Sequence, residues 1–181
     1  MAQTSALEYA LVGLLKQKPQ SGYDLRKEFA TTPMRHYSDS PGSIYPALRR
    51  LQARTWVKAN SQTEGRKRQL FRVTAVGDRA FTAWLQQPPT RDDLIWRMEE
   101  VTLRFAFHSG NVPVTATRHF LEVLEHELAA YVGELRRYAS QSGLANQNST
   151  GALAFASGIA GYESDLNWAK RARRKLTEKK S

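Results

Sequence analysis

Two clusters of side chains in the first half of the sequence have the chemistry to contact phosphate groups and the edges of DNA bases. They are Ser43, Tyr45, Arg49 and Arg50 on a predicted helix, and Arg66, Lys67 and Arg68 on a predicted turn. A B-DNA major groove admits one α-helix, and the N-terminal end of that helix presents free N–H groups to phosphates. Guanidinium groups reach phosphates or guanine edges, and the basic turn would lie along the neighbouring backbone or minor groove. These residue types predict contacts with double-stranded DNA.

The elements that must position these clusters follow the order helix, helix, helix, hairpin, helix. The signals are a capping box at Ser5, a second cap at Ser21, a helix opening at Ser40, strands at 56–59 and 69–73, and a cap at Thr74. This is the order of a winged helix-turn-helix followed by a linking helix. Taken alone, two arginines on a helix are more typical of a solvated surface than of a binding site, and so is a basic turn. A winged helix-turn-helix would present the basic helix and the basic turn side by side, and this combination favours DNA binding.

Charge is unevenly distributed along the chain, which supports the same partner. The 181 residues include 27 Lys and Arg against 17 Asp and Glu, for a formal charge of +10. Residues 1–90 hold 14 basic and 6 acidic side chains, whereas residues 91–169 hold 6 basic and 10 acidic ones. A basic front half suggests a domain that faces polyanions, most often nucleic acid. An anionic membrane is the weaker alternative, since the sequence has no strongly amphipathic basic helix.

The composition excludes several other kinds of site. The chain has no cysteine, which excludes disulfide frameworks, thiolate zinc sites, iron–sulfur clusters and cysteine nucleophiles. Its first residues carry no basic stretch before an apolar core, which predicts no secretory signal. The longest weakly polar run, Ala152–Tyr162, falls well short of the roughly 20 residues of a membrane span. We therefore expect a soluble cytoplasmic protein.

The second half predicts a helical domain that is separated from the first at Pro88-Pro89, giving domains of residues 1–87 and 90–176. An early helix is marked by the apolar residues Leu94, Met98, Val101 and Phe105. Two later helices carry apolar residues at coiled-coil spacing. The first has Leu121, Leu124, Leu128, Tyr131, Leu135 and Tyr138, and the second has Phe155, Ile159, Tyr162, Leu166 and Ala169. Such a seam needs a partner, either within the chain or in a second copy. The expected fold class is mainly α, with a winged helix-turn-helix DNA-binding domain followed by an α-helical dimerisation domain.

Catalysis is not expected from this sequence. Ser, His and Asp are present, but no nucleophile elbow or glycine-rich phosphate loop accompanies them. His119, Glu122 and His126 share one side of a helix and could ligate a metal, but residues beside a leucine seam usually form a hydrated face. We expect no catalytic residue, no metal and no cofactor. The competing hypothesis is a basic protein that coats nucleic acid without regard to its sequence.

Four aromatic residues are candidates for an apolar pocket that binds a small effector: Trp96, Phe107, Phe120 and Trp168. Ordinary packing in the core or in an interface is the alternative for each of them. Trp96 is the first candidate, because it follows the domain break and so can stand near an inter-domain cleft.

The motifs themselves resemble those of the PadR-like transcriptional regulators. The resemblance covers Ala6–Leu15, Ser21–Leu25, Gly42–Leu51 and Phe71–Thr74 followed by Gly77, and it extends more loosely to Met98–Phe105. It implies homodimeric DNA-binding regulators, most often repressors, some of which are released by small hydrophobic or phenolic effectors. In such proteins the Gly-Ser-Ile-Tyr-Pro block opens the recognition helix, which implies that Ser43, Ile44 and Tyr45 lie at the DNA.

Two features of this chain depart from the family pattern. The family usually has a glycine between the recognition helix and the first wing strand, where this chain has Arg54-Thr55-Trp56. A helix end without that glycine must form its left-handed cap with another residue. The wing, whose cations map to Lys67 and Arg68, is rich in arginine and lacks the proline that is common there.

Overall fold

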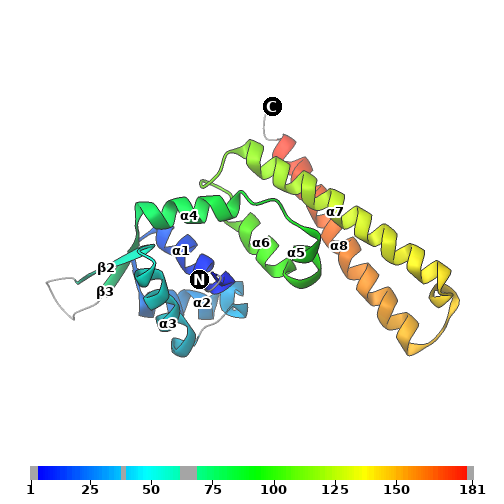
Figure 1. Ribbon diagram of the computed structural model, residues 1–181, viewed down its shortest axis with the longest axis horizontal. Helices are drawn as coiled ribbons and strands as arrows, with labels where there is room; N and C mark the ends of the chain where they lie inside the picture. The colour runs from blue at the N-terminus through cyan, green and yellow to red at the C-terminus, as the bar shows by residue number, and fades with distance from the viewer. Residues whose placement is uncertain (1–3, 38–39, 62–68, 179–181) are drawn as a thin grey trace. The chain divides into compact units, whose positions relative to one another are not determined.

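The computed structural model describes residues 4–37, 40–61 and 69–178, and the chain folds into two compact units, Met1–Leu85 and Gln86–Ser181. The first unit contains α1 (Ala6–Gln17), β1 (Gln20–Ser21), α2 (Gly22–Thr31), the 3-10 helix η1 (Pro33–His36), α3 (Pro41–Ala53), β2 (Val57–Ser61), β3 (Gln69–Val73) and α4 (Ala75–Leu85) (Figure 1). The chain is mainly α with one small antiparallel sheet, and the predicted winged helix-turn-helix class is confirmed.

Local capping signals start the helices of the first unit where the sequence predicted them. The Ser5 hydroxyl accepts the N–H of Glu8 while the Glu8 carboxylate accepts the N–H of Ser5, and Ser21 and Asp24 form the same reciprocal pair at α2. Thr74 accepts the N–H of Gly77 at 3.1 Å, so it caps α4. Each cap satisfies N–H groups that have no partner within the helix, which fixes where the helix begins.

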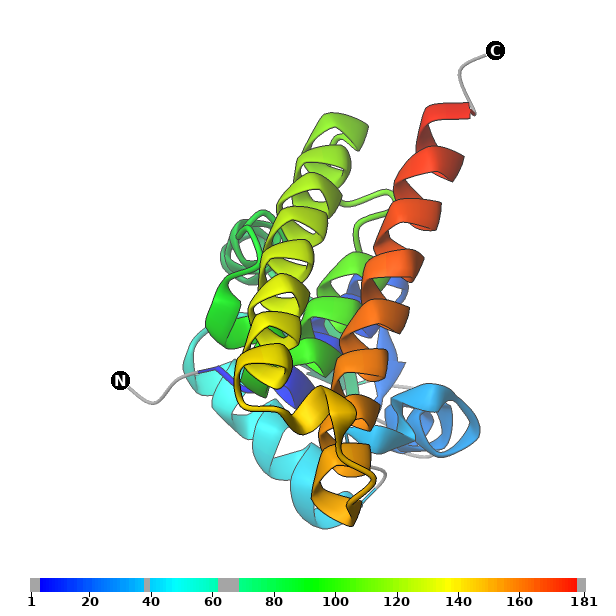
Figure 2. The same ribbon diagram turned by 90° about the vertical axis from the view of Figure 1, so that its right-hand side faces the viewer.

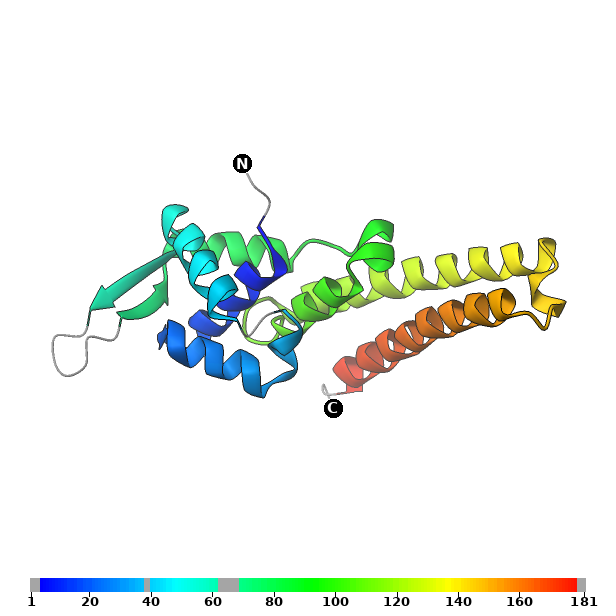
Figure 3. The ribbon, with the colours of Figure 1, turned by 90° about the horizontal axis from the view of Figure 1, so that it is seen from below.

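The sheet has one strand that the sequence did not predict. β2 and β3 form the expected hairpin, with Lys58 opposite Arg72, and β1 adds to the other edge of β3 through Ser21 opposite Leu70. Figure 3 shows the hairpin projecting from the helices of this unit. A strand of two residues is too short to show an alternating pattern, so only its long-range pairing reveals it.

The helix α3 ends in a left-handed turn without glycine. Thr55 has a φ of 59°, its N–H bonds to the carbonyl of Gln52 at 2.8 Å, and the N–H of Trp56 bonds to the carbonyl of Leu51 at 2.9 Å. These two bonds make a Schellman motif, which is usually built on glycine. A β-branched residue therefore stands where the family usually has glycine, in a backbone conformation that costs about 1–2 kcal/mol.

The second unit is a helical assembly dominated by two long antiparallel helices. Its elements are α5 (Arg91–Trp96), α6 (Met98–Ala106), α7 (Val114–Gln141), the 3-10 helix η2 (Leu144–Asn146) and α8 (Thr150–Glu178). Figure 2 shows α7 and α8 side by side along their length. Buried residues shared by α5, α6, α7 and α8 include Leu94, Val101, Leu124, Leu128 and Ala169. The apolar seam of α7 is thus paired with α8 of the same chain.

A break at Arg97 divides the helix that the sequence predicted around 94–105. Arg97 has non-helical angles, and its carbonyl accepts the N–H groups of Glu100 and Val101, so it begins a new helix. The predicted single helix is wrong for this reason.

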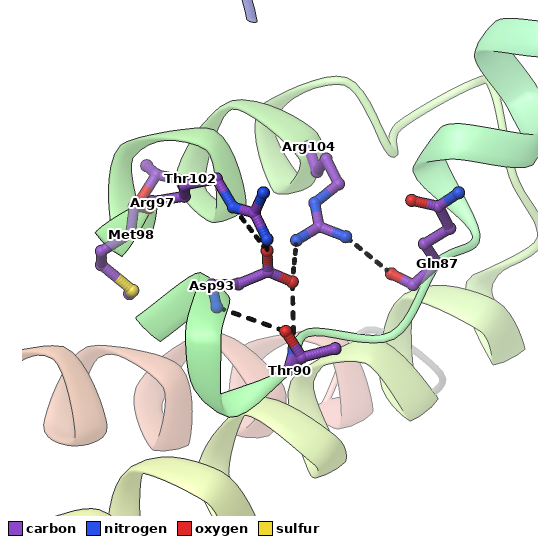
Figure 4. Close-up of polar contacts among 7 residues, drawn as sticks. All are labelled: Gln87, Thr90, Asp93, Arg97, Met98, Thr102 and Arg104. Atoms are coloured by element: carbon purple, nitrogen blue, oxygen red, sulfur yellow. Dashed lines mark hydrogen bonds and ion pairs between the residues drawn. The ribbon is translucent and has the colours of Figure 1, made fainter. Parts of the chain in front are cut away.

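The break brings Arg104 and Arg97 to one carboxylate, that of Asp93. Nη2 of Arg104 lies 2.9 Å from Oδ2 of Asp93, and Nη2 of Arg97 lies 2.9 Å from Oδ1 (Figure 4). Arg104 also donates to the carbonyl of Gln87 at 3.1 Å, and the N–H of Thr90 donates to Asp93. Burial acts to raise the pKa of Asp93, but the hydrogen bonds from Thr90 and Arg104 outweigh it and hold the pKa below its ordinary value.

Candidate nucleic-acid interface

The predicted recognition helix, α3, has one buried face and one exposed face. Ile44, Ala47, Leu48 and Leu51 are buried in the core of the first unit, whereas Tyr45, Arg49 and Arg50 are exposed. Because residues three and four apart share a side of a helix, these two groups point in different directions.

Ile44 corrects one prediction. Its side chain is 0% exposed, so it packs in the core and has no surface to offer DNA. The prediction of Ile44 as a DNA contact is therefore wrong for the side chain. Ser43 is half-buried beside it, at the third residue of the helix.

The start of α3 presents polar backbone groups together with Tyr45. Ser40 caps the helix: its hydroxyl accepts the N–H of Gly42 at 3.2 Å, and its carbonyl accepts the N–H groups of Ser43 and Ile44. Pro46 has no N–H to donate to the carbonyl of Gly42, four residues earlier. The first turn of α3 thus carries a backbone acceptor without its usual helical partner, and the exposed Tyr45 belongs to the same turn region.

A buried carboxylate, Glu8, holds two arginines, Arg50 within α3 and Arg54 at its C-cap. Its Oε1 accepts the Nε of Arg50 at 2.6 Å, and its Oε2 accepts Nη1 of Arg54 at 3.1 Å. Glu8 is buried, whereas half of the Arg50 side chain is exposed. The bond to Nε fixes the plane of the Arg50 guanidinium and leaves its two terminal amino groups to donate elsewhere. In the sequence, Glu8 was recognisable only as a capping residue, because its pairing with residues more than 40 positions away leaves no local signal.

Arg49 differs from Arg50 in having no ion pair with any other described residue. It is exposed, one turn after Tyr45 on the same helix. A solvated arginine of this kind can turn toward an approaching phosphate at little desolvation cost.

The hairpin places two further cations opposite each other. Lys58 of β2 and Arg72 of β3 are directly paired in register, and both are exposed. Like charges directly opposite on one face of a sheet repel each other, and a polyanion would relieve that repulsion. This pair was not among the predicted DNA contacts, since its two members lie on different strands. The three cations that were predicted on the hairpin, Arg66, Lys67 and Arg68, lie outside the described residues.

The four candidate effector residues do not share one environment. Phe107 and Phe120 are buried in the second unit, where Phe120 packs edge-on to His108 with ring centroids 4.7 Å apart. Neither offers surface to a ligand, so their prediction as pocket residues is corrected to core packing. Trp168 is half-buried and packs edge-on to Phe105, whereas Trp96 is 79% exposed.

The possible metal ligands on α7 do not form a cluster. His119, Glu122 and His126 are exposed, and within residues 4–37, 40–61 and 69–178 no group of three or more His, Asp or Glu side chains has the arrangement of a metal site. No described helix is both long enough and apolar enough to cross a membrane.

The sequence of the first unit matches a known family. Residues 11–83 match the model of the transcriptional regulator PadR-like family. The first unit is thus similar to PadR-like regulators over most of its length. Over 81 residues the chain is 28% identical to the negative transcriptional regulator PadR of Bacillus subtilis (strain 168), and this match spans 44% of each protein. The chain thus covers less than half the length of that curated relative.

Several solved structures of PadR proteins are also similar to the chain. Bacillus subtilis PadR in complex with operator DNA is 18% identical, with a TM-score of 0.44 over 95% of this chain and 99% of that one. The same protein in complex with p-coumaric acid is 19% identical, with a TM-score of 0.40 over 98% of each chain. A PadR-like transcriptional regulator from Bacillus cereus is 24% identical, with a TM-score of 0.40 over 93% of this chain and 94% of that one.

Proposed function

We propose that this chain is a sequence-specific DNA-binding transcriptional regulator that acts as a homodimeric repressor. The observation that carries the proposal is the outer face of α3 in the unit that is similar to PadR-like regulators, where Tyr45, Arg49 and Arg50 are exposed while the opposite face is buried. A helix with one face in the core and a polar, cationic face outside has the form of a major-groove reader.

Each exposed side chain has a distinct role in the proposed complex. Arg50, held at its Nε by Glu8, donates its terminal amino groups to a phosphate, while Arg49 reaches a phosphate or a guanine edge. Ser43 and Tyr45 contact DNA at the start of the helix. Lys58 and Arg72 lie along the neighbouring phosphate backbone, and the sequence predicts that Arg66, Lys67 and Arg68 add further phosphate contacts.

The proposed homodimer forms through the second unit. On α8, Gly158 and Gly161 have no atom within 4 Å of the position where a side chain would begin, and the apolar Leu153 is exposed nearby. Small residues on an exposed helix face allow another helix to approach closely. A two-fold dimer presents equivalent α3 helices to an inverted-repeat operator, with half-sites about one helical turn or a multiple of it apart.

The proposed effector is a small apolar or phenolic compound that releases the protein from DNA. Bacillus subtilis PadR has been solved in complex with p-coumaric acid, which makes this compound a direct probe. Trp96 remains the first candidate contact, because its indole is exposed, and Trp168 is the second. An effector of this kind acts only to the extent that it binds the DNA-free form more tightly than the DNA-bound form.

Selection of fragments from random duplexes by the purified protein tests the proposal. We expect one inverted-repeat motif, and Arg49→Ala should weaken binding to it by about 1–3 kcal/mol if the arginine contacts a base edge. Arg137→Ala, an exposed arginine in the second unit, is the matched control. Recovery of fragments without a shared motif would instead support the competing hypothesis, a basic protein that coats nucleic acid without regard to its sequence.

The contribution of the hairpin is measured by salt dependence. Replacing both Lys58 and Arg72 with alanine should reduce the log–log slope of affinity against salt by about 1.8, since each lost phosphate contact removes roughly 0.9. An unchanged slope would show that the described part of the hairpin does not touch the backbone of DNA.

A further inference from the structure

Tyr45 rests against a residue that has no side chain. A Cβ atom added to Gly22, the first residue of α2, would lie 2.5 Å from Cε1 of the Tyr45 ring, 3.1 Å from Cζ and 3.2 Å from Cδ1. The edge of the tyrosine ring therefore occupies the space that any side chain at position 22 would need. Tyr45 is nevertheless 42% exposed, so its ring is supported on one side and open on the other.

The backbone on the α2 side of this contact is anchored. Ser21 pairs with Leu70 in the sheet, and its hydroxyl lies 2.6 Å from Oδ2 of Asp24 in the capping box of α2. Gly22 follows directly, is buried, and belongs to the first turn of the helix. A shift of Gly22 would break both the strand pairing and the cap.

The backbone on the α3 side is anchored as well. Ile44 and Ala47, on either side of Tyr45 and Pro46, are both fully buried in the core. Since neither helix can yield, a side chain at position 22 must displace the Tyr45 ring itself. A tyrosine ring moves by rotation about two side-chain torsions, so this displacement leaves the fold intact.

We infer that Gly22 is a positioning residue for DNA recognition: the absence of a side chain there sets the direction of Tyr45 and holds its hydroxyl at one place on the outer face of α3. The inference rests on the proposed function, because it gives Tyr45 a contact with the operator. A side chain that is fixed before binding loses less conformational entropy when the complex forms. Gly22 thus contributes to affinity without touching DNA.

A double-mutant cycle on the full-length protein tests this inference. The dissociation constant for the selected operator is measured for the parent, Gly22→Ala, Tyr45→Ala and the double variant. We expect Gly22→Ala and Tyr45→Ala each to weaken binding about tenfold, and the double variant to bind no worse than Tyr45→Ala alone. Gly133→Ala is the control for a helical glycine, since nothing lies within 4 Å of its added Cβ, and it should leave the affinity unchanged.

Nuclear magnetic resonance reports the position of the ring without DNA. In the parent, the Hα protons of Gly22 should show cross-relaxation with the ring protons of Tyr45. The nearby aromatic ring should also shift the resonances of the Gly22 Hα protons. Gly22→Ala should remove this signature while the methyl signals of Ile44 and Leu48 stay in place. A ring that keeps its position in Gly22→Ala would overturn the inference.

The outcomes separate this inference from the proposed function. Tyr45→Ala with the affinity of the parent would remove Tyr45 from the DNA contacts and overturn both statements for this residue. Weaker binding by Tyr45→Ala with no effect of Gly22→Ala, or with fully additive effects, would overturn only the role of Gly22. If Gly22→Ala fails to fold, the double variant Gly22→Ala with Tyr45→Ala decides the question. We expect the double variant to fold, because the Tyr45 ring is absent. A double variant that also fails to fold would show that the fold needs glycine at position 22 for another reason, and would overturn the inference.

Discussion

The two arginines that share the Asp93 carboxylate should differ sharply in their contribution to stability, although both lie 2.9 Å from it. Arg104 is 3% exposed and Arg97 is 43% exposed. Removing one partner of a buried ion pair costs about 3–5 kcal/mol, whereas an exposed pair contributes about 0–1 kcal/mol. Because Asp93 keeps Arg97 and Thr90, we expect Arg104→Met to destabilise the second unit by about 3 kcal/mol and Arg97→Met by less than 1 kcal/mol.

Urea unfolding followed by circular dichroism measures both values. Hydrogen exchange of peptides from residues 91–106 assigns the change to the second unit, which matters because two units need not unfold together. Arg97→Met is the matched control, since it removes the same kind of side chain from the same carboxylate. Equal losses for the two variants would refute the argument that burial decides the contribution.

The pH dependence of the same pair has a defined sign. The pKa of Asp93 lies below its ordinary value of 3.8 in the folded protein, so its ionised form stabilises the fold above that value, and this stabilisation is lost as the pH falls through the folded pKa. Arg104→Met removes one of the hydrogen bonds that lower the pKa of Asp93. The difference in unfolding free energy between the parent and Arg104→Met should therefore be largest near neutral pH and shrink below pH 3.8. A difference that grows in acid would contradict this assignment.

Three further substitutions test the packing described above. Thr55→Gly should raise the melting temperature, with a gain of about 1 kcal/mol, because glycine adopts a positive φ without strain; a loss of stability would mean that the threonine side chain outweighs its backbone strain. Gly77→Ala should destabilise the first unit by about 1–3 kcal/mol in thermal unfolding, since its Cβ would clash with the carbonyl oxygen of Trp56, and an unchanged melting temperature would contradict that close approach. Leu128→Lys should unfold the second unit, with loss of helical circular dichroism, because it buries a charge in the core of its own chain, and a folded monomer would instead place Leu128 in an interface between copies.

Local signals explain why most of the first unit could be predicted from the sequence. The pairs Ser5 and Glu8, and Ser21 and Asp24, lie three residues apart, so a capping box is visible to anyone who reads the chain in order. The hairpin strands are likewise indicated by their β-branched and aromatic residues. What these signals share is that the interacting groups are close in sequence.

Contacts between distant residues account for what the sequence did not reveal. The strand at Gln20–Ser21 exists only through its pairing with β3, and Glu8 meets Arg50 across 42 positions. The apolar seam of α7 indicated that a partner was needed without specifying whether it lay in the same chain, and α8 provides it. For Phe107 and Phe120, aromatic character fits a pocket and a core equally well, so only burial decides between them.

Ile44 and Tyr45 show how a motif and helical periodicity can disagree about neighbouring residues. The resemblance to the family placed both at the DNA, because both belong to the block that opens α3. Helical periodicity instead places Ile44 on the same side as Ala47 and Leu48, since one residue along a helix is a rotation of about 100°. The structure follows periodicity: Ile44 faces the core and Tyr45 faces outward against Gly22. A motif marks a stretch of helix, but the direction of each side chain within it is set by geometry, so Ile44 acts by fixing the helix from which Tyr45 projects.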